Sequence, residues 1–161
     1  MAAGSALWSP LIFCILYLHV ASQSCKEGWY YHAGSCYNFG ESRVTWAAAQ
    51  AICRAYGGKL AEIETPDENE FLKSIAKDKR VEYAFLGGTD IFGEGMWEWA
   101  STGDRISPFV DWAPDQPDDN TGQDCLGFRR DSYYQWNDDS CTLTASFICE
   151  AKSTDGPIVG M

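Results

Sequence analysis

The chain has 161 residues, a length that suits one domain of ordinary size. Its formal net charge is −11 at pH 7. This excess of acid disfavours a nucleic-acid partner, because binding to polyphosphate depends on clustered Lys and Arg. The acidity is either a means of keeping the protein in solution or a means of attracting divalent cations.

Residues 1–22 carry no charged side chain, and the apolar run 11–20 is too short to span a bilayer comfortably. Val20 and Ser22 are small enough for a signal-peptide cleavage site. We therefore expect a signal peptide over 1–22 and a secreted, extracellular protein with no membrane anchor after cleavage. An uncleaved anchor is the alternative, and it would need a longer apolar run with basic flanks.

Cysteine usage supports export. Of seven cysteines, one, Cys14, lies in the predicted signal peptide, which leaves an even number in the exported chain. An even number in a secreted chain predicts a disulfide framework, and the residues alone leave its connectivity open. There is no Cys-x-x-Cys pair, and His32 is the only histidine beyond the signal peptide, so a zinc site is disfavoured.

Two segments have the signals of helices. In the first, Thr45 is a suitable N-cap and Gly57 a suitable C-terminal stop. In the second, Thr65 is the N-cap, Pro66 takes the first helical position and Glu68 completes a capping box. Helical spacing predicts the inner faces. They comprise Ala48, Ala49, Ile52, Cys53 and Tyr56 in the first helix and Phe71, Leu72 and Ile75 in the second.

Beyond residue 82 the pattern changes to short apolar runs bounded by Gly, Pro, Asp and Asn, which predict strands. Trp97 and Trp99 alternate on one face and are expected in the core. Helices first and strands later indicate an α+β domain. A short C-terminal tail, residues 151–161, is expected to be disordered.

The span 106–123 shows little regular pattern, and it includes most of the stretch "APDQPDDNTGQDC" at 113–125. Four aspartates, two glutamines and an asparagine leave almost nothing apolar there. A long irregular loop in a compact domain is usually functional or disordered. This stretch is therefore either a solvated acidic loop or a loop whose oxygens face a ligand.

Taken in order, the motifs "CKEGWYYHAGSCY", "TWAAAQAICRAYGGKLAEI", "FLGGTD", "QPD", "WND" and "FICE" resemble a C-type lectin-like domain over residues 25–150. The resemblance implies an α+β fold with two helices, two small antiparallel sheets and a long calcium-binding loop. It also implies the disulfides of the long form of that domain, namely Cys25–Cys36, Cys53–Cys149 and Cys125–Cys141.

The resemblance further implies calcium (Ca2+) as cofactor, a hard cation that prefers oxygen ligands. Pro117 is expected to follow a cis peptide bond, which puts the side chains on either side of it together. The primary calcium and carbohydrate site would comprise Gln116, Asp118, Gln123, Asn137 and Asp138. An auxiliary calcium site would comprise Asp90, Glu94, Asp119 and Asp124, for which a merely solvated acidic surface is the alternative.

In the resembled family, "QPD" is the galactose-type pattern and "EPN" the mannose-type pattern. We therefore expect galactose or N-acetylgalactosamine first, with mannose-type cross-binding possible. Two positions depart from the family: Gln123 stands where Glu is usual, and no aromatic residue follows "QPD" to stack on galactose. Tyr133 and Tyr134 are the alternative candidates for that stacking contact.

The function expected is that of a secreted, calcium-dependent lectin of innate immunity that binds glycans, microbial surface polysaccharide included. Because single sugar sites are weak, an oligomer would raise the avidity. The alternative is a member of the fold that binds no sugar and acts as a structural, mineral-matrix or protein-binding module. An enzyme is not expected, because no nucleophile–base arrangement is visible and His32, the only histidine beyond the signal peptide, lies in the N-terminal "YYHAGS" turn.

Overall fold

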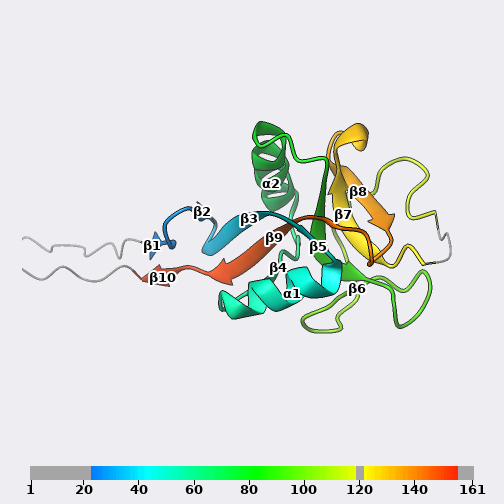
Figure 1. Ribbon diagram of the computed structural model, residues 1–161, viewed down its shortest axis with the longest axis horizontal. Helices are drawn as coiled ribbons and strands as arrows, with labels where there is room; N and C mark the ends of the chain where they lie inside the picture. The colour runs from blue at the N-terminus through cyan, green and yellow to red at the C-terminus, as the bar shows by residue number, and fades with distance from the viewer. Residues whose placement is uncertain (1–22, 119–121, 156–161) are drawn as a thin grey trace, which may run out of the picture.

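The computed structural model describes residues 23–118 and 122–155. The expected signal peptide and Asp119 therefore lie outside the described residues. Two α-helices and a large mixed sheet make up the fold (Figure 1). The elements are β1 Gln23–Ser24, β2 Tyr30–His32, β3 Ser35–Val44, α1 Trp46–Ala55, β4 Lys59–Leu60, α2 Pro66–Asp78, β5 Tyr83–Thr89, β6 Glu98–Trp99, β7 Cys125–Arg129, the 3-10 helix η1 Arg130–Ser132, β8 Gln135–Asp139, β9 Ala145–Lys152 and β10 Thr154–Asp155.

The main sheet has eight strands, in the order β2-β3-β9-β5-β7-β8, with β4 added to β9 and β6 added to β5. Every pairing is antiparallel except that of β5 with β9, which is parallel. A separate ribbon of β1 and β10 brings the two ends of the described chain together. The α+β class is confirmed, but the strands form this mixed sheet and ribbon in place of the two small antiparallel sheets that we expected.

Both helices begin where the sequence predicts. The Thr45 hydroxyl accepts a hydrogen bond from the Ala48 N–H, and the Thr65 hydroxyl accepts one from the Glu68 N–H. The Glu68 carboxylate, however, reaches the N–H of Glu64 at 3.0 Å, one residue before the N-cap. The capping box is therefore extended by one residue, and it fixes the approach of the chain to α2 as well as its first turn.

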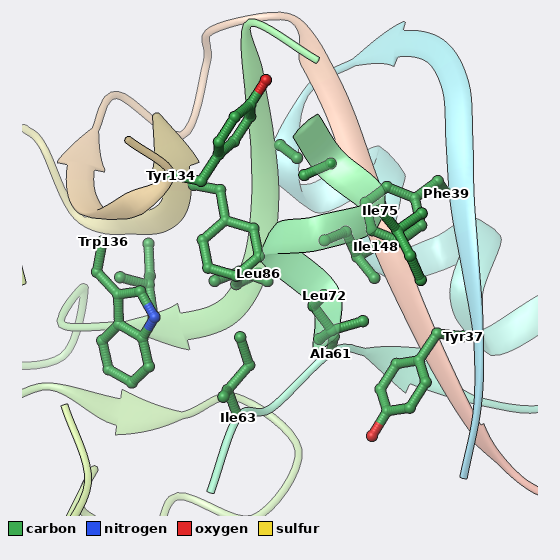
Figure 2. Close-up of a cluster of buried hydrophobic side chains, with 14 of the residues drawn as sticks. Tyr37, Phe39, Ala61, Ile63, Leu72, Ile75, Leu86, Tyr134, Trp136 and Ile148 are labelled. Carbon is green, nitrogen blue, oxygen red and sulfur yellow. The ribbon is translucent and has the colours of Figure 1, made fainter. Parts of the chain in front are cut away.

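The two helices pack on opposite sides of the long β3–β9 pair, as Figure 1 shows. Each covers its own apolar cluster, with Leu72 of α2 in one and Cys53 of α1 in the other. Figure 2 shows the cluster that includes Leu72 of α2, in which Leu72 and Leu86 lie between Trp136 on one side and the side chains of β3 and β9 on the other. Both predicted core tryptophans, Trp97 and Trp99, are buried.

Close approach between elements requires a glycine in β5. The N–H of Gly87 donates to the Ala61 carbonyl at 2.8 Å. A Cβ placed on Gly87 would lie 2.8 Å from the Glu62 side chain and 2.9 Å from the Leu60 carbonyl oxygen. These distances are far below ordinary contact, so only glycine lets the segment after β4 lie against β5.

Two expectations about local structure were wrong, and one strand was not predicted. Tyr56 was placed on the inner face of the first helix but is 46% exposed, because it is the C-cap residue and lies past the last helical turn. The N-terminal strand β3 was missed, although it is the longest strand of the sheet. The proposed tail begins too early, since β9 extends to Lys152 and β10 pairs Thr154 with Ser24.

All three disulfides form as expected: Cys25–Cys36, Cys53–Cys149 and Cys125–Cys141. The second joins α1 to β9 across 96 residues of sequence. In the chain-entropy model, closing so long a loop contributes on the order of 4–5 kcal/mol to stability. The third ties the start of β7 to the segment after β8, and so holds the end of this hairpin where the acidic stretch enters. Across residues 23–118 and 122–155, no helix has the length and apolar character needed to cross a membrane.

Candidate functional site

The irregular loop that follows β6 is fastened to β8 by its backbone. The Trp136 N–H donates to the Asp111 carbonyl, and the Ala113 N–H donates to the Trp136 carbonyl, both at 2.8 Å. The Trp112 ring packs edge-on against Trp136 at a centroid distance of 5.8 Å. The loop before residue 116 therefore has a defined position on the sheet.

The Asp111 carboxylate is the anchor of this loop, and we did not identify it from the sequence. It accepts hydrogen bonds from Asn69 at 2.7 Å and from the Lys73 ammonium at 2.9 Å, both donated by α2. Gln135 of β8 donates to its other oxygen at 3.3 Å. The sequence did contain one signal for this role, since Asp111 lies between the apolar residues Val110 and Trp112. An acid that is drawn toward the core by such neighbours needs hydrogen-bond donors.

The peptide bond between Gln116 and Pro117 is cis, as the resemblance implied. The Gln116 N–H donates to the Ala113 carbonyl at 3.0 Å, which closes a turn before the proline. Within the part of the chain that the structure describes, the Gln116 side-chain carbonyl oxygen is buried and has no hydrogen-bond partner. A buried oxygen without a donor is costly, so this position favours a ligand that supplies positive charge.

Asp118 and Gln123 lie together, on either side of the segment that is not described. The Gln123 side-chain amide donates to Asp118 Oδ1 at 2.7 Å. A glutamate at position 123 could not make this bond, because an ionised carboxylate only accepts. The departure from the family pattern therefore replaces charge repulsion by a hydrogen bond.

Asn137 and Asp138 project from β8, where they pair with Gly127 and Leu126 of β7. Both are buried, and Asp138 is 1% exposed. Among the described residues, Asp138 Oδ1 has no hydrogen-bond partner. Burial raises the pKa of Asp138 to about 6, and the negative charges of Asp118 and Asp90 add to the effect. A cation beside this carboxylate would relieve both effects.

The auxiliary set is only partly brought together. The Asp90 N–H donates to the Asp124 carbonyl at 3.3 Å, and the Thr89 hydroxyl donates to the same oxygen at 2.7 Å. Asp90 is buried and accepts a hydrogen bond from the Gly95 N–H at 2.9 Å. Glu94 lies on the exposed turn between Asp90 and Gly95. Asp119 lies outside the described residues.

The donor set fits a hard cation in chemistry, because it combines carboxylate and amide oxygens, two of them buried and without hydrogen-bond partners among the described residues. No group of three or more Asp, Glu, His or Cys side chains arranged to hold a metal ion occurs in residues 23–118 and 122–155. The primary set is instead mixed, with two carboxylates, Asp118 and Asp138, and three amides. Such a set supplies two formal charges and depends on neutral oxygens for the remainder.

The two tyrosines considered for sugar stacking do not lie at this end of the hairpin. Tyr133 and Tyr134 follow η1, beside the pairing of Arg129 with Gln135, whereas the acidic stretch enters at Cys125, which pairs with Asp139. These two pairings are four residue steps apart, which cover about 13 Å along a strand. The fold therefore places both tyrosines away from the point where the acidic stretch enters.

His32, the one histidine considered for catalysis, is held by structural contacts. Its ring stacks on Phe71 at a centroid distance of 4.3 Å, and its Nε2 lies 3.2 Å from Asp67. Both partners belong to α2, Asp67 in its first turn and Phe71 near its middle. The histidine thus joins the β2–β3 hairpin to that helix.

A protein-family model described as Lectin C-type domain matches residues 42–151. Perlucin of Haliotis laevigata is 37% identical over 133 residues, which cover 80% of this chain and 83% of perlucin. Nattectin of Thalassophryne nattereri, a galactose-specific lectin, is 31% identical over 134 residues and covers 80% of this chain and 81% of its own.

Human C-type lectin domain family 10 member A is 33% identical over 133 residues, or 79% of this chain. The chain spans only 40% of the length of that relative. Among solved structures, a calcium-independent type II antifreeze protein aligns with a TM-score of 0.75 at 26% identity, over 84% of this chain and 100% of its own. The mouse scavenger receptor C-type lectin carbohydrate-recognition domain aligns with the same TM-score and identity, over 81% of this chain and 100% of its own.

Proposed function

The chain belongs to the C-type lectin domain family, and on that premise we propose that it is a secreted lectin that binds galactose-type sugars through calcium. The observation that carries the proposal is the pair of buried oxygens, one from Gln116 and one from Asp138, that lack hydrogen-bond partners among the described residues. They belong to the "QPD" motif in the loop after β6 and to the "WND" motif in β8.

The residues that would hold the cation supply side-chain oxygens from both motifs. Calcium, when bound, offers coordination positions to two neighbouring sugar hydroxyls. The ligand side chains would also hydrogen-bond those hydroxyls, and their hydrogen-bonding capacity differs on the two sides of Pro117. Gln116 can donate and accept, whereas Asp118 can only accept. The proposed ligand set comprises Gln116, Asp118, Gln123, Asn137 and Asp138, with Asp90, Glu94, Asp119 and Asp124 proposed for the auxiliary cation.

Galactose or N-acetylgalactosamine is the proposed first choice, and mannose-type sugars the second. The order of donor and acceptor across Pro117 supports galactose, and the relative nattectin is a galactose-specific lectin. Exchange of both residues, Gln116→Glu with Asp118→Asn, should shift the ratio of affinities toward mannose by about tenfold, or about 1.4 kcal/mol. An unchanged ratio, measured by titration calorimetry with both sugars, would contradict this assignment of specificity.

The central experiment is retention on galactose resin with calcium and with a chelator. The protein should be retained with calcium and released by the chelator, and Asp118→Ala should abolish retention. Asp131→Ala is the matched control, because it removes one exposed acid from η1, at the other end of the hairpin. Retention that ignores the chelator would refute the calcium mechanism, provided that all variants keep the thermal transition of the native protein.

The expected partners are glycans, including microbial surface polysaccharide, and we propose no enzymatic activity because the family consists of non-catalytic, carbohydrate-binding proteins. A second candidate function is a structural or protein-binding role without sugar. One observation favours it: a calcium-independent antifreeze protein shares the fold over 84% of this chain. A glycan array that stays blank at every calcium concentration, while mineral or protein binding persists, would support this second candidate over the first.

A further inference from the structure

A basic hollow lies on this otherwise acidic protein. The chain has 12 Lys and Arg against 23 Asp and Glu. A hollow of about 380 Å³ is nevertheless lined by three basic side chains and two phenol rings. These are Lys77, Arg80, Arg130, Tyr133 and Tyr134. The hollow lies between the end of α2 and η1, both at the top of the view in Figure 1, and so at the far end of the β7–β8 hairpin from the proposed calcium loop.

The two walls of the hollow are tied together by hydrogen bonds. The chain reverses after α2 at Arg80, which has a φ of 54°, and the Val81 N–H donates to the Ala76 carbonyl at 3.1 Å. The Arg130 N–H then donates to the Glu82 carbonyl at 3.0 Å, and the Arg130 guanidinium forms an ion pair with the Glu82 carboxylate. The basic groups are therefore presented by a connected frame.

The turn after η1 holds two tyrosines in a conformation that side chains seldom adopt. Tyr133 and Tyr134 have φ values of 54° and 61°, in the left-handed region that disfavours residues with a Cβ. The turn is held by the Tyr133 N–H, which donates to the Arg130 carbonyl at 3.0 Å. As a result the Tyr133 side chain is 86% exposed, while Tyr134 is 7% exposed.

The ring of Tyr134 belongs to the apolar cluster, and Figure 2 shows its hydroxyl pointing away from Leu86 and Trp136. Burial raises the pKa of Tyr134, and the nearby Arg130 charge opposes that rise. The phenol therefore stays protonated at neutral pH and can donate a hydrogen bond. Tyr133 and Tyr134 thus give the hollow an apolar rim and a neutral donor on its wall.

The chemistry of the hollow is that of an anion acceptor beside an apolar ring. Among the residues that the structure describes, Lys77 and Arg80 form no ion pair. An exposed tyrosine ring offers a flat surface to the C–H face of a sugar ring, since it is apolar in its body and polar at its tip.

We propose that this hollow binds a short anionic saccharide, one or two sugar units that carry a sulfate or a carboxylate, without calcium. The basic side chains would bind the anionic group, and Tyr133 would pack against the ring that carries it. A volume of about 380 Å³ is near the lower end of small-molecule sites, which suits one or two units. The net charge of −11 disfavours a long polyanion, because a long chain would extend beyond the hollow over a protein of net negative charge.

The test is a titration followed by NMR on the full mature protein, with a chelator present throughout. The probes are lactose sulfated on its galactose unit, unsulfated lactose, inorganic sulfate and a short oligoglutamate peptide. We expect sulfated lactose to shift the signals of Lys77 and Tyr133, with a Kd at least about tenfold lower than that of each other probe. Because the chelator removes any contribution of calcium, this result is independent of the proposed galactose site.

Three variants distinguish a binding role from a structural one. Lys77→Gln with Arg80→Asn should weaken sulfated lactose at least about tenfold, and Asn tolerates the left-handed backbone at position 80. Tyr133→Asn should weaken sulfated lactose more than it weakens inorganic sulfate. Glu82→Gln should tighten binding, which loss of a merely structural contact would not do. Lys152→Ala is the control, since it removes one exposed positive charge outside the hollow.

Four outcomes would overturn the proposal. The first is that sulfated lactose shifts no signal of the hollow. The second is that inorganic sulfate binds as tightly as sulfated lactose, which would indicate a plain anion site. The third is that oligoglutamate binds as tightly as sulfated lactose, which would indicate an acidic protein partner. The fourth outcome is that the Lys77, Arg80 and Tyr133 variants bind sulfated lactose as tightly as the native protein and the Lys152→Ala control do. Failure of the calcium loop to bind galactose leaves each of these measurements unaffected.

Discussion

Two regions of this molecule use buried oxygens in opposite ways. Beside β4 and α2, the Glu62 carboxylate accepts hydrogen bonds from the Lys59 ammonium and from the N–H and hydroxyl of Ser101. Glu68 accepts from the Tyr37 hydroxyl and from a backbone N–H of the α2 cap. At the end of β8, by contrast, Asp138 keeps a buried oxygen without a hydrogen-bond partner among the described residues.

The difference teaches that burial of an acid does not by itself mark a binding site. The acids beside β4 and α2 have their oxygens satisfied by the protein, so their role is structural. One oxygen of the Asp138 carboxylate, Oδ1, is buried without a hydrogen-bond partner among the described residues. Burial also raises the pKa of this carboxylate to about 6, although backbone hydrogen bonds oppose the rise. Substitutions at Asp138, Glu62, Gln123 and Glu150 test this contrast.

Asp138→Asn should have the largest effect. It removes one of two formal charges from the proposed primary set while keeping the side-chain shape, so calcium should bind about 100-fold more weakly. The calcium-free protein should unfold at an equal or higher temperature, because a buried charge is removed. Calorimetric titration with calcium and thermal unfolding without it measure the two effects. Calcium binding of native strength would place the cation elsewhere.

Glu62→Ala should act only on stability. Removal of this buried acid leaves the Ser101 N–H without its partner and leaves the Lys59 ammonium with only the more distant Glu150, at 3.9 Å. We expect a cost of about 2 kcal/mol in the free energy of unfolding. Urea unfolding gives the magnitude, and Glu62→Gln is the control that keeps the volume. Calcium affinity should stay at the native value. A large loss of calcium binding in a folded variant would erase the contrast between the regions.

Gln123→Glu should sharpen the contrast by adding the charge that is usual at this position. Calcium should bind about tenfold more tightly, equivalent to about 1.4 kcal/mol. In the absence of calcium the new carboxylate loses the hydrogen bond to Asp118 and repels it. We therefore expect a lower thermal transition without calcium and a larger rise on adding it. A variant with unchanged affinity would show that position 123 lies outside the cation site.

Glu150→Gln should have the smallest effect, visible in the pH dependence of stability. Burial raises the pKa of Glu150, and the Lys59 charge and the Ser35 hydroxyl only partly oppose this. An acid with a raised folded pKa binds more protons in the folded state, so its contribution to stability is present below the unfolded pKa and is lost as pH rises through the folded pKa.

The unfolding free energy of the native protein, relative to Glu150→Gln, should therefore decrease as pH rises above about 4.3, the usual value for an unfolded Glu. Urea unfolding of both proteins at a series of pH values measures it. The opposite slope would mean that Lys59 and Ser35 stabilise the charged form more than burial destabilises it. Glu150 would then resemble an ordinary ion-paired acid.

The sequence alone determined the elements with local chemical signals and, through the resemblance, the family and the disulfide pairing. Thr45 and Thr65 cap their helices because an N-cap needs only a side chain three residues before an N–H. The sequence pattern did not predict strand β3, because residues from Glu41 to Arg43 in its second half are polar and exposed. The strand β3 pairs with β9, which lies more than 100 residues away in the sequence.

Only the tertiary structure decided which polar residues are satisfied by the protein. Asp111, Glu62 and Asp138 are all acids near apolar residues in the sequence, and no local pattern separates them. The first two receive donors from α2 and from the Ser101 segment, whereas Asp138 Oδ1 receives none among the described residues. The physical reason is that the partners of a buried oxygen come from elements distant in the chain, so its satisfaction depends on packing rather than on its neighbours in sequence.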